Sequence, residues 1–231
     1  MELFYAHKVV NKKFILSDDE TKHAVRVMRK KIGEEIYATD GRGNIYKGKI
    51  ESVEKNILFA EILETQFREK TFPNIKFFIP NLRNKDRLRF AVEKLTELGI
   101  TNIIIYSSER TVSRNLNIDK WEKVALAAMK QSLHAHLPKI EFLPQVKDFR
   151  KRNEIKTVLL DQEGEISVND FLSRINLNDE LEFFIGPEGD FTETEKELIA
   201  SDYNVKLDNY RFRSETAVIS LASAIVLCLK S

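Results

Sequence analysis

The sequence has few of the residues that cross-link a chain or bind a metal. It contains one cysteine and four histidines in 231 residues, and they are scattered along the chain. The single cysteine, Cys228, excludes an intramolecular disulfide and indicates a reducing, cytoplasmic location. The separation of these residues matches no metal-ligand spacing, so we expect no metal site.

The sequence also lacks a long hydrophobic run. Its N-terminus has no apolar core of signal-peptide length. The most apolar stretch, 217–229, reads AVISLASAIVLCL and is too short to cross a bilayer, so no membrane partner is expected. This stretch predicts a helix that is apolar almost all round and is therefore buried, either in the core or in a subunit interface.

Neither sign of charge dominates, because the net charge is +1. This balance argues against a surface that binds polyanions as a whole, but it leaves room for a local basic patch. The segment 22–31, KHAVRVMRKK, carries five lysines and arginines and no acid. It is either a solvated charged face or a surface for phosphate groups.

Residues 1–70 predict a small β-barrel domain with one helix. Strand-type runs cover 35–40, 45–53 and 57–63, and the sequence DGRGN at 40–44 predicts a hairpin between the first two. The helix is predicted to begin at the capping box of residues 17–20, in which Ser17 and Glu20 would each bond the other's main-chain N–H.

The composition changes at 66–73, which we interpret as a linker. From 74 to 231 strand-type and helix-type segments alternate, and this alternation predicts a parallel sheet covered on both faces. The predicted strands are 75–80, 102–106, 157–160, 181–185 and 205–207, and the predicted helices are 86–98, 119–132 and 214–230.

Two of the eight glycines and one of the five prolines stand together at one place. The sequence FFIGPEGDF at 183–191 turns from an apolar strand through Gly186, Pro187 and Gly189. Ligands of open parallel sheets bind beyond the carboxyl ends of strands, and glycines permit positive φ and close approach to the main chain. Residues 192–195 then predict a capping box for the next helix. The loop lacks the glycine spacing of phosphate-binding motifs. It is therefore either a site for another kind of ligand or a tight strand–helix connection without a ligand.

A second unusual loop, LDNYRFRSETA at 207–217, alternates arginines with aromatic residues before the apolar helix. Ser214 is the predicted N-cap, and Glu215 suits the first turn of the helix. Arg213 lies beside a helix N-terminus, where a cation is unfavourable. We therefore expect an anionic partner for Arg213, such as Glu188, Glu215 or a substrate, the alternative being a solvated arginine.

These two loops resemble the closing motifs of the RsmE-type 16S rRNA uridine N3-methyltransferases, which belong to the SPOUT superfamily. Further similar segments follow one another in the family's order over essentially the whole chain. They are HAVRVMR at 23–29, EKLTELGI at 93–100, SER at 108–110 and AAMKQS at 127–132, the last preceded by Trp121. Each match is weak by itself, but together they form a specific pattern.

The chain departs from the family pattern at several positions. The departures are Asp190 in place of the second glycine of GPEGG, His134 in place of an arginine, and Asp208, Asn209, Phe212 and Ser214 in the closing motif. The N-terminus also lacks the paired arginines that the family often has. The departures at His134 and at the N-terminus bear on the contacts with RNA.

The resemblance implies an α/β fold: a SPOUT methyltransferase domain at 74–231 with a C-terminal trefoil knot, preceded by a PUA-like RNA-binding β-barrel domain at 1–70. Knots are nearly absent from proteins, so this feature depends on the resemblance alone. The resemblance also implies a homodimer and S-adenosylmethionine as the methyl donor. The acceptor would be N3 of a uridine in 16S rRNA, either free or in the small ribosomal subunit.

The resemblance further implies roles for individual residues. Arg213 would stabilise the anion that develops on the uracil, and Glu215 or Thr216 would orient Arg213 or the base. The expected cofactor-binding residues are Leu160, Ile185, Gly186, Pro187, Glu188, Gly189, Leu207, Asn209, Phe212 and Ser214. The expected RNA-binding residues are Arg26, Arg29, Lys30, Arg83, Lys94, Arg110, Arg114, Gln131 and Ser132.

Two other functions remain open at the level of sequence. The chain could be an RNA-binding protein that has the SPOUT fold but lacks the activity, which Asp190 and Asn209 would signal. It could also be a SPOUT methyltransferase that acts on a different RNA. Binding of S-adenosylmethionine separates the first alternative from the enzyme, and mapping of the modified uridine separates the second.

Overall fold

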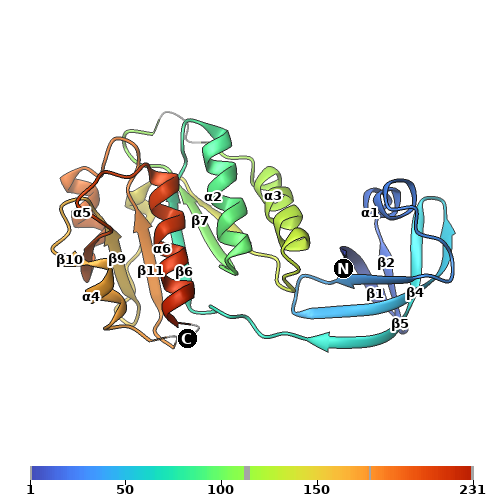
Figure 1. Cartoon of the computed structure of the whole chain (residues 1–231). Helices are drawn as coiled ribbons and strands as arrows, with labels where there is room; N and C mark the ends of the chain where they lie inside the picture. Colours follow the sequence, from blue (N-terminus) through green and yellow to red (C-terminus); the bar gives the residue numbers. More distant parts are fainter. Residues whose placement is uncertain (1, 112–114, 177, 230–231) are drawn as a thin grey trace. The chain divides into compact units, whose positions relative to one another are not determined.

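The computed structural model describes residues 2–111, 115–176 and 178–229, and the chain divides into two compact units (Figure 1). The first unit comprises Met1–Lys70 and Leu126–Leu137. The second comprises Thr71–Ala125 and Pro138–Ser231. Helix α3 (Ile118–Gln131) begins in the second unit and ends in the first.

The first unit is built on a closed β-barrel with the strand order β1-β2-β5-β4-β3. Its strands are β1 (Leu3–Val10), β2 (Lys13–Leu16), β3 (Glu35–Thr39), β4 (Asn44–Glu54) and β5 (Ile57–Phe67). Neighbouring strands are antiparallel except for β1 and β3, whose parallel pairing closes the barrel. Side chains alternate between the two faces of a strand, so Phe14, Ile36 and Leu58 point into a closed core and are fully buried.

Two helical segments follow β2: α1 (Asp18–Lys22) and the π-helical turn η1 (His23–Val27). The Ser17 hydroxyl accepts from the main-chain N–H of Glu20, as predicted. The other half of the predicted capping box is wrong. The Glu20 carboxylate instead accepts from the main-chain N–H of Tyr5 at 2.9 Å and pairs with Lys130. These partners come from β1 and α3, which the local sequence cannot specify.

The end of α3 and the residues after it bond to the barrel. The carbonyl of Ala135 accepts from the N–H of Gly43 at 2.9 Å and from the hydroxyl of Thr39 at 3.2 Å. The N–H of Leu137 donates to the carbonyl of Gly41 at 2.9 Å. These hydrogen bonds are made to the turn between β3 and β4, the hairpin that the sequence predicted. They connect residues 126–137 to the barrel, and these residues belong to the first unit.

The second unit contains a parallel sheet with the strand order β10-β12-β9-β11-β6-β7-β8. Its strands are β6 (Ile75–Pro80), β7 (Asn102–Tyr106), β8 (Lys139–Leu143), β9 (Lys156–Leu160), β10 (Ile166–Ser167), β11 (Leu181–Ile185) and β12 (Tyr203–Lys206). The predicted parallel sheet is confirmed. The edge strands β8 and β10 were not predicted, because one is only partly buried and the other is two residues long.

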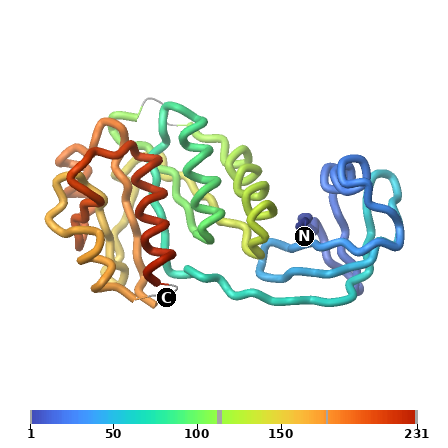
Figure 2. Tube along the Cα trace, viewed as in Figure 1, coloured from blue at the N-terminus to red at the C-terminus, as the bar shows by residue number. Residues whose placement is uncertain are grey.

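Helices cover both faces of this sheet (Figures 1 and 2). They are α2 (Lys85–Glu97), α4 (Val168–Leu172), α5 (Glu193–Ile199) and α6 (Ser214–Leu229), with a 3₁₀ turn η2 (Val146–Asp148). Phe183 meets Phe171 of α4, whereas its neighbour Phe184 shares a buried cluster with Ile199 of α5. Successive strand residues point to opposite faces, so α4 and α5 lie on opposite sides of the sheet. Helices α2 and α6 pack against each other on the α4 side.

Helix α6 is buried along most of its length, as its composition predicted. Ala217, Val218, Leu221, Ala222 and Ile225 are buried in the second unit. The last turn differs, because Leu227 is 74% exposed and Cys228 is also exposed. Within the described parts of the chain, no helix has both the length and the apolar character that crossing a membrane requires.

Candidate functional site

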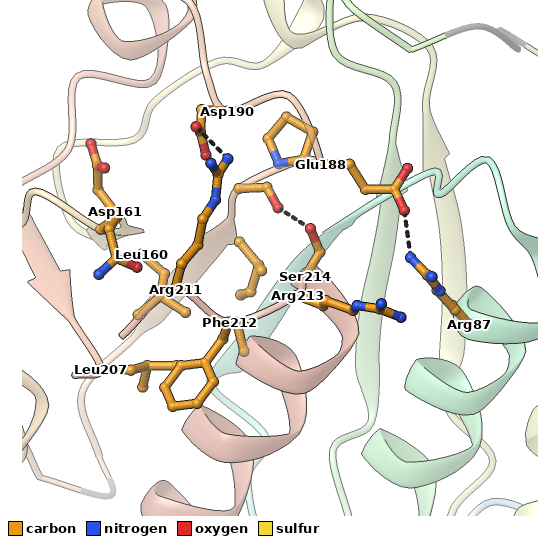
Figure 3. A pocket seen from close by; sticks show the side chains of 15 residues that line it. Arg87, Leu160, Asp161, Glu188, Asp190, Leu207, Arg211, Phe212, Arg213 and Ser214 are labelled. Atoms are coloured by element: carbon orange, nitrogen blue, oxygen red, sulfur yellow. Dashed lines mark hydrogen bonds and ion pairs between the residues drawn. The ribbon is translucent and has the colours of Figure 1, made fainter. Parts of the chain in front are cut away.

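A pocket of about 420 Å³ opens at the carboxyl ends of β9, β11 and β12 in the second unit (Figure 3). This volume lies in the range of small-molecule sites, roughly 300 to 1,000 Å³. The lining residues come from the last positions of β9 and β11, from the loops after these strands and after β12, and from α2 and α6. They are Arg87, Leu160, Asp161, Gln162, Ile185, Gly186, Pro187, Glu188, Asp190, Leu207, Arg211, Phe212, Arg213, Ser214 and Ala217.

The loop after β11 has its left-handed residue at an unexpected position. We expected Gly186 and Gly189 to supply positive φ, but the residue with φ of +56° is Asp190. Aspartate is among the side chains that adopt this conformation more readily than most. A Cβ added at Gly186 would meet only the Leu160 carbonyl and the Phe191 ring, both at 3.7 Å. Packing within the chain therefore does not require glycine at 186, and the open side of this residue is available to a ligand.

The helix that follows this loop begins as predicted. The Thr192 hydroxyl accepts from the N–H of Glu195 at 3.2 Å, and the Glu195 carboxylate accepts from the N–H of Thr192 at 3.0 Å. The second oxygen of Glu195 accepts from the N–H of Glu109 at 2.8 Å. The capping box is confirmed, and it also fixes the segment after β7 against the start of α5.

Two hydroxyls hold the carbonyls at the end of β11. The buried phenol of Tyr106 donates to the Ile185 carbonyl at 2.6 Å, and burial raises its pKa well above the usual 10.0, so it remains a donor. The Ser214 hydroxyl donates to the Gly186 carbonyl at 2.7 Å. The predicted N-cap role of Ser214 is therefore wrong. This residue is the first of α6, and it joins the helix to the loop after β11.

Arg87 of α2 binds the two carboxylates that we assigned to Arg213. Its guanidinium lies 2.9 Å from Glu188 and 3.4 Å from Glu215. The Glu215 side chain is only 11% exposed, so its charge requires a nearby cation. Arg87 therefore connects the loop after β11 to the first turn of α6.

A second ion pair joins the two loops that we singled out. Arg211 donates to the Asp190 carboxylate at 2.8 Å, and Figure 3 shows this contact beside the pocket. Both side chains are about two-thirds exposed, at 67% and 66%. Asp161, which also lines the pocket, pairs with Lys196 at 2.8 Å. Most charged groups around the pocket are thus already paired with an opposite charge.

Arg213 is the exception in this pocket. It lines the cavity and is exposed, and among the described residues its guanidinium makes no ion pair or hydrogen bond. The carboxylates that were expected to bind it are held by Arg87. Its charge is therefore available to a ligand.

The pocket brings together most of the predicted cofactor residues. Gly189 and Asn209 do not line it: Gly189 accepts a hydrogen bond from Arg110 through its carbonyl, and Asn209 is exposed. Of the predicted catalytic residues only Arg213 lines the cavity, since Glu215 is buried and Thr216 is exposed. The lining residues that we predicted neither as cofactor-binding nor as catalytic are Arg87, Asp161, Gln162, Asp190, Arg211 and Ala217. The position of Asp161 and Gln162 directly after β9 was a usable signal for these two.

The predicted RNA-binding residues lie in both units. Arg26, Arg29, Lys30, Gln131 and Ser132 belong to the first unit, and Arg83, Lys94 and Arg110 belong to the second. Lys94 is already paired with Glu93 and Glu97, so less of its charge is available to phosphate. Arg114 lies outside the described residues. In the described part of the chain, no group of three or more potential metal ligands occurs.

Comparison with known proteins agrees with this geometry. Residues 69–226 match the model of the RNA methyltransferase domain family, and residues 16–63 match the RNA methyltransferase PUA domain. The chain is 30% identical to the ribosomal RNA small subunit methyltransferase E of Rickettsia conorii, with 94% of this chain and 91% of that protein covered. The chain belongs to the ribosomal RNA small subunit methyltransferase E family.

Solved structures of known proteins have the same fold as this chain. A probable rRNA-methyltransferase from Porphyromonas gingivalis matches with a TM-score of 0.87 and 26% identity, covering 100% of this chain and 99% of that one. The Neisseria gonorrhoeae ribosomal RNA small subunit methyltransferase E, bound to S-adenosyl methionine, matches in fold with a TM-score of 0.85 and 24% identity, covering 99% and 98%. The predicted α/β fold, a parallel-sheet domain preceded by a small PUA-like β-barrel, is confirmed.

Proposed function

We propose that this protein transfers a methyl group from S-adenosylmethionine to N3 of a uridine in the small-subunit 16S rRNA. The observation that carries the proposal is the pocket at the carboxyl ends of β9, β11 and β12, where Arg213 is the arginine left without a partner among the described residues. Membership of an rRNA methyltransferase family supports the reaction class and the type of RNA. The N3 position comes from the resemblance of the closing motifs.

The pocket has the chemistry that the methyl donor requires. S-adenosylmethionine combines an adenosyl group with a zwitterionic, positively charged chain, and one Neisseria relative was solved with it bound. Leu160, Ile185 and Leu207 offer apolar walls and strand-end main chain, and Gly186 lets a ligand come close. When S-adenosylmethionine is bound there, it supplies the electrophilic methyl group. The paired charges around the pocket would face the charged end of the donor.

Arg213 has the position and charge to act on the acceptor base. N3 of uridine carries an imide proton whose pKa is above neutral, so the nucleophilic form is an anion that must be stabilised. A fixed guanidinium near a uracil carbonyl stabilises this developing charge. We propose that role for Arg213. Glu215 would act indirectly, because it holds the first turn of α6 to Arg87, and Thr216 would contact the base from the same turn.

The proposed RNA contacts depend on exposed cations in both units. Arg26 and Arg29 in the first unit and Arg83 and Arg110 in the second are exposed. Contacts of this kind position RNA through its phosphates and carry no base specificity. We also propose a homodimer, supported by the exposed apolar last turn of α6 around Leu227. Light scattering of the purified protein tests the dimer, and the cytoplasmic location stays a prediction.

The test of the proposed function has two measurements. Isothermal titration with S-adenosylmethionine should show binding, and its absence would exclude the enzyme and leave an RNA-binding protein. Mass mapping of 16S rRNA from a strain that lacks this gene should then show one uridine without its N3-methyl group. An unchanged 16S rRNA pattern, together with a change in another RNA, would assign the enzyme to that other substrate.

A further inference from the structure

The turn after α1 exposes three apolar side chains to solvent. Val27 is 66% exposed, Met28 44% and Ile32 66%. Immediately before them Ala24 is fully buried and Val25 packs against the barrel core. The segment is thus anchored in the barrel at residues 24–25, and most of residues 26–32 are then exposed. Exposed side chains of this size, gathered within six residues, indicate a contact surface.

The backbone of this segment is held in a defined conformation. The N–H of Met28 donates to the His23 carbonyl and the N–H of Lys30 donates to the Ala24 carbonyl, both at 3.0 Å. The first of these bonds closes the π-helical turn η1, and Arg29 adopts a φ of +57°. π-Helical turns are rare and often lie at functional sites. The apolar side chains are therefore presented by an ordered turn.

The charge of this segment is all of one sign. Arg26, Arg29 and Lys31 are exposed, and none of them forms an ion pair with another described residue. No acid occurs from 21 to 33. Such a surface complements a polyanion, because each bound cation releases counterions from the phosphates. Charge complementarity thus selects RNA over an apolar protein surface as the partner.

We propose that the 26–32 segment binds unpaired nucleotides of the rRNA, with Val27, Met28 and Ile32 against base faces and the cations on the phosphates. This inference rests on the proposed RNA substrate and adds a structural class to it. A continuous duplex keeps its bases stacked and offers mainly phosphates and 2′-hydroxyls. Apolar side chains gain contact area only where bases are splayed out, as in loops and bulges.

The experiment measures the affinity of the full chain for a short unstructured RNA oligonucleotide and for its fully paired duplex, at several salt concentrations. Combined replacement Val27→Ser, Met28→Ser and Ile32→Ser should lower the affinity for the single strand about tenfold and leave the salt slope unchanged. The pair Arg26→Gln and Arg29→Gln should instead flatten the slope of log K against log salt by about 1.4. Duplex affinity should change only in the arginine variant.

Leu63 provides the matched control. It is 52% exposed on the same barrel but stands among acids, with Glu61 and Glu64 close in sequence. Leu63→Ser should leave both affinities unchanged. Thermal melting of every variant shows whether its fold is intact. The single variant Ile32→Ser is included because residue 32 lies outside the π-helical turn, so this replacement does not disturb that turn.

Equal single-strand affinity of the triple variant and the wild type would overturn the inference, as would an equal loss on the duplex. Weaker binding to assembled small subunits with unchanged binding to free RNA would also overturn it and assign the segment to a ribosomal protein. The proposed function fails separately, if the wild-type protein transfers no methyl group to rRNA while the RNA affinities behave as expected.

Discussion

The pocket of the second unit and the 26–32 segment of the first both carry arginines, but these arginines have different neighbours. Around the pocket Arg87 and Arg211 are paired with carboxylates, and only Arg213 has no partner among the described residues. In the 26–32 segment Arg26 and Arg29 are exposed without any acid nearby in sequence. A region of paired charges suits a small ligand that carries both signs, whereas unpaired cations suit a long polyanion. Each of the following variants tests one side of this difference.

The largest effect is expected at Arg213, because it is the charged residue of the pocket that has no partner among the described residues. Arg213→Ala should reduce the rate of methyl transfer about 100-fold, which is the typical loss of one electrostatic donor to a developing anion. The affinity for S-adenosylmethionine, measured by titration, should change much less. Arg213→Lys serves as the control that keeps the charge. Wild-type turnover in the alanine variant would exclude a catalytic role for this residue.

Arg87 should matter for stability as much as for activity. Arg87→Ala leaves the buried Glu215 carboxylate without its cation and should lower the free energy of unfolding by about 2 kcal/mol, measured by urea denaturation. The double variant Arg87→Ala with Glu215→Gln should recover part of this loss, since the uncompensated charge is gone. If both variants are equally unstable, Arg87 acts through packing and the charge argument fails.

Asp40 shows how a paired charge in the barrel depends on pH. Burial raises its pKa, but bonds from Asn44, the Arg42 N–H and Tyr46 outweigh this and hold the pKa below 3.8. A lowered pKa means that the stabilisation is present above the unfolded pKa and is lost as the pH falls through the folded pKa. Wild-type stability should therefore fall below about pH 4.

Asp40→Asn should cost about 2 kcal/mol at neutral pH, because the amide keeps one acceptor oxygen and puts an NH2 donor where the second carboxylate oxygen accepts hydrogen bonds. The variant should also show a weaker decrease on acidification, measured by chemical denaturation across the acidic range. Burial and the neighbouring Asp40 raise the pKa of the Tyr46 phenol to about 12, so Tyr46 remains a hydrogen-bond donor across the acidic range. Tyr46→Phe is the control that removes one donor and keeps the carboxylate. Identical acid dependence of wild type and Asp40→Asn would assign this decrease to other groups.

The smallest effect is expected at the exposed Asp190–Arg211 pair. Asp190→Gly should change stability and cofactor affinity by less than about 0.5 kcal/mol, because exposed ion pairs contribute little and glycine adopts positive φ freely. Asp190→Ala should lower the free energy of unfolding by about 1 kcal/mol more than Asp190→Gly, because alanine does not adopt positive φ freely. Thermal melts at low and high salt separate the two contributions. A large loss in the glycine variant would show that this pair matters more than its exposure indicates.

Buried strands were the easiest part of the fold to predict. The predicted runs 75–80, 102–106 and 181–185 coincide with β6, β7 and β11, because strands buried on both faces are continuous apolar runs. The short edge strands β8 and β10 lack such a run and were missed. The parallel pairing of β1 with β3 also left no local signal, since it joins segments that are not neighbours in sequence.

The pocket residues that could be predicted from the sequence are those in the loops that directly follow strands. Leu160, Gly186 and Leu207 were found because each lies at or just beyond a carboxyl end. Arg87 was missed as a site residue because it contacts Glu188 from a helix 101 positions earlier. Nothing near Arg87 in the sequence distinguishes it from the other basic residues of α2.

The sequence by itself determined the strand runs, the capping box at Thr192 and Glu195, and the two loops that carry the family motifs. These features depend on residues within a few positions of one another, so local patterns contain them. The tertiary structure decided which charges are paired and therefore that Arg213 was left without a described partner. Ion pairs and side-chain hydrogen bonds act through space, so their partners are fixed only when the sheet and its helices bring distant segments together.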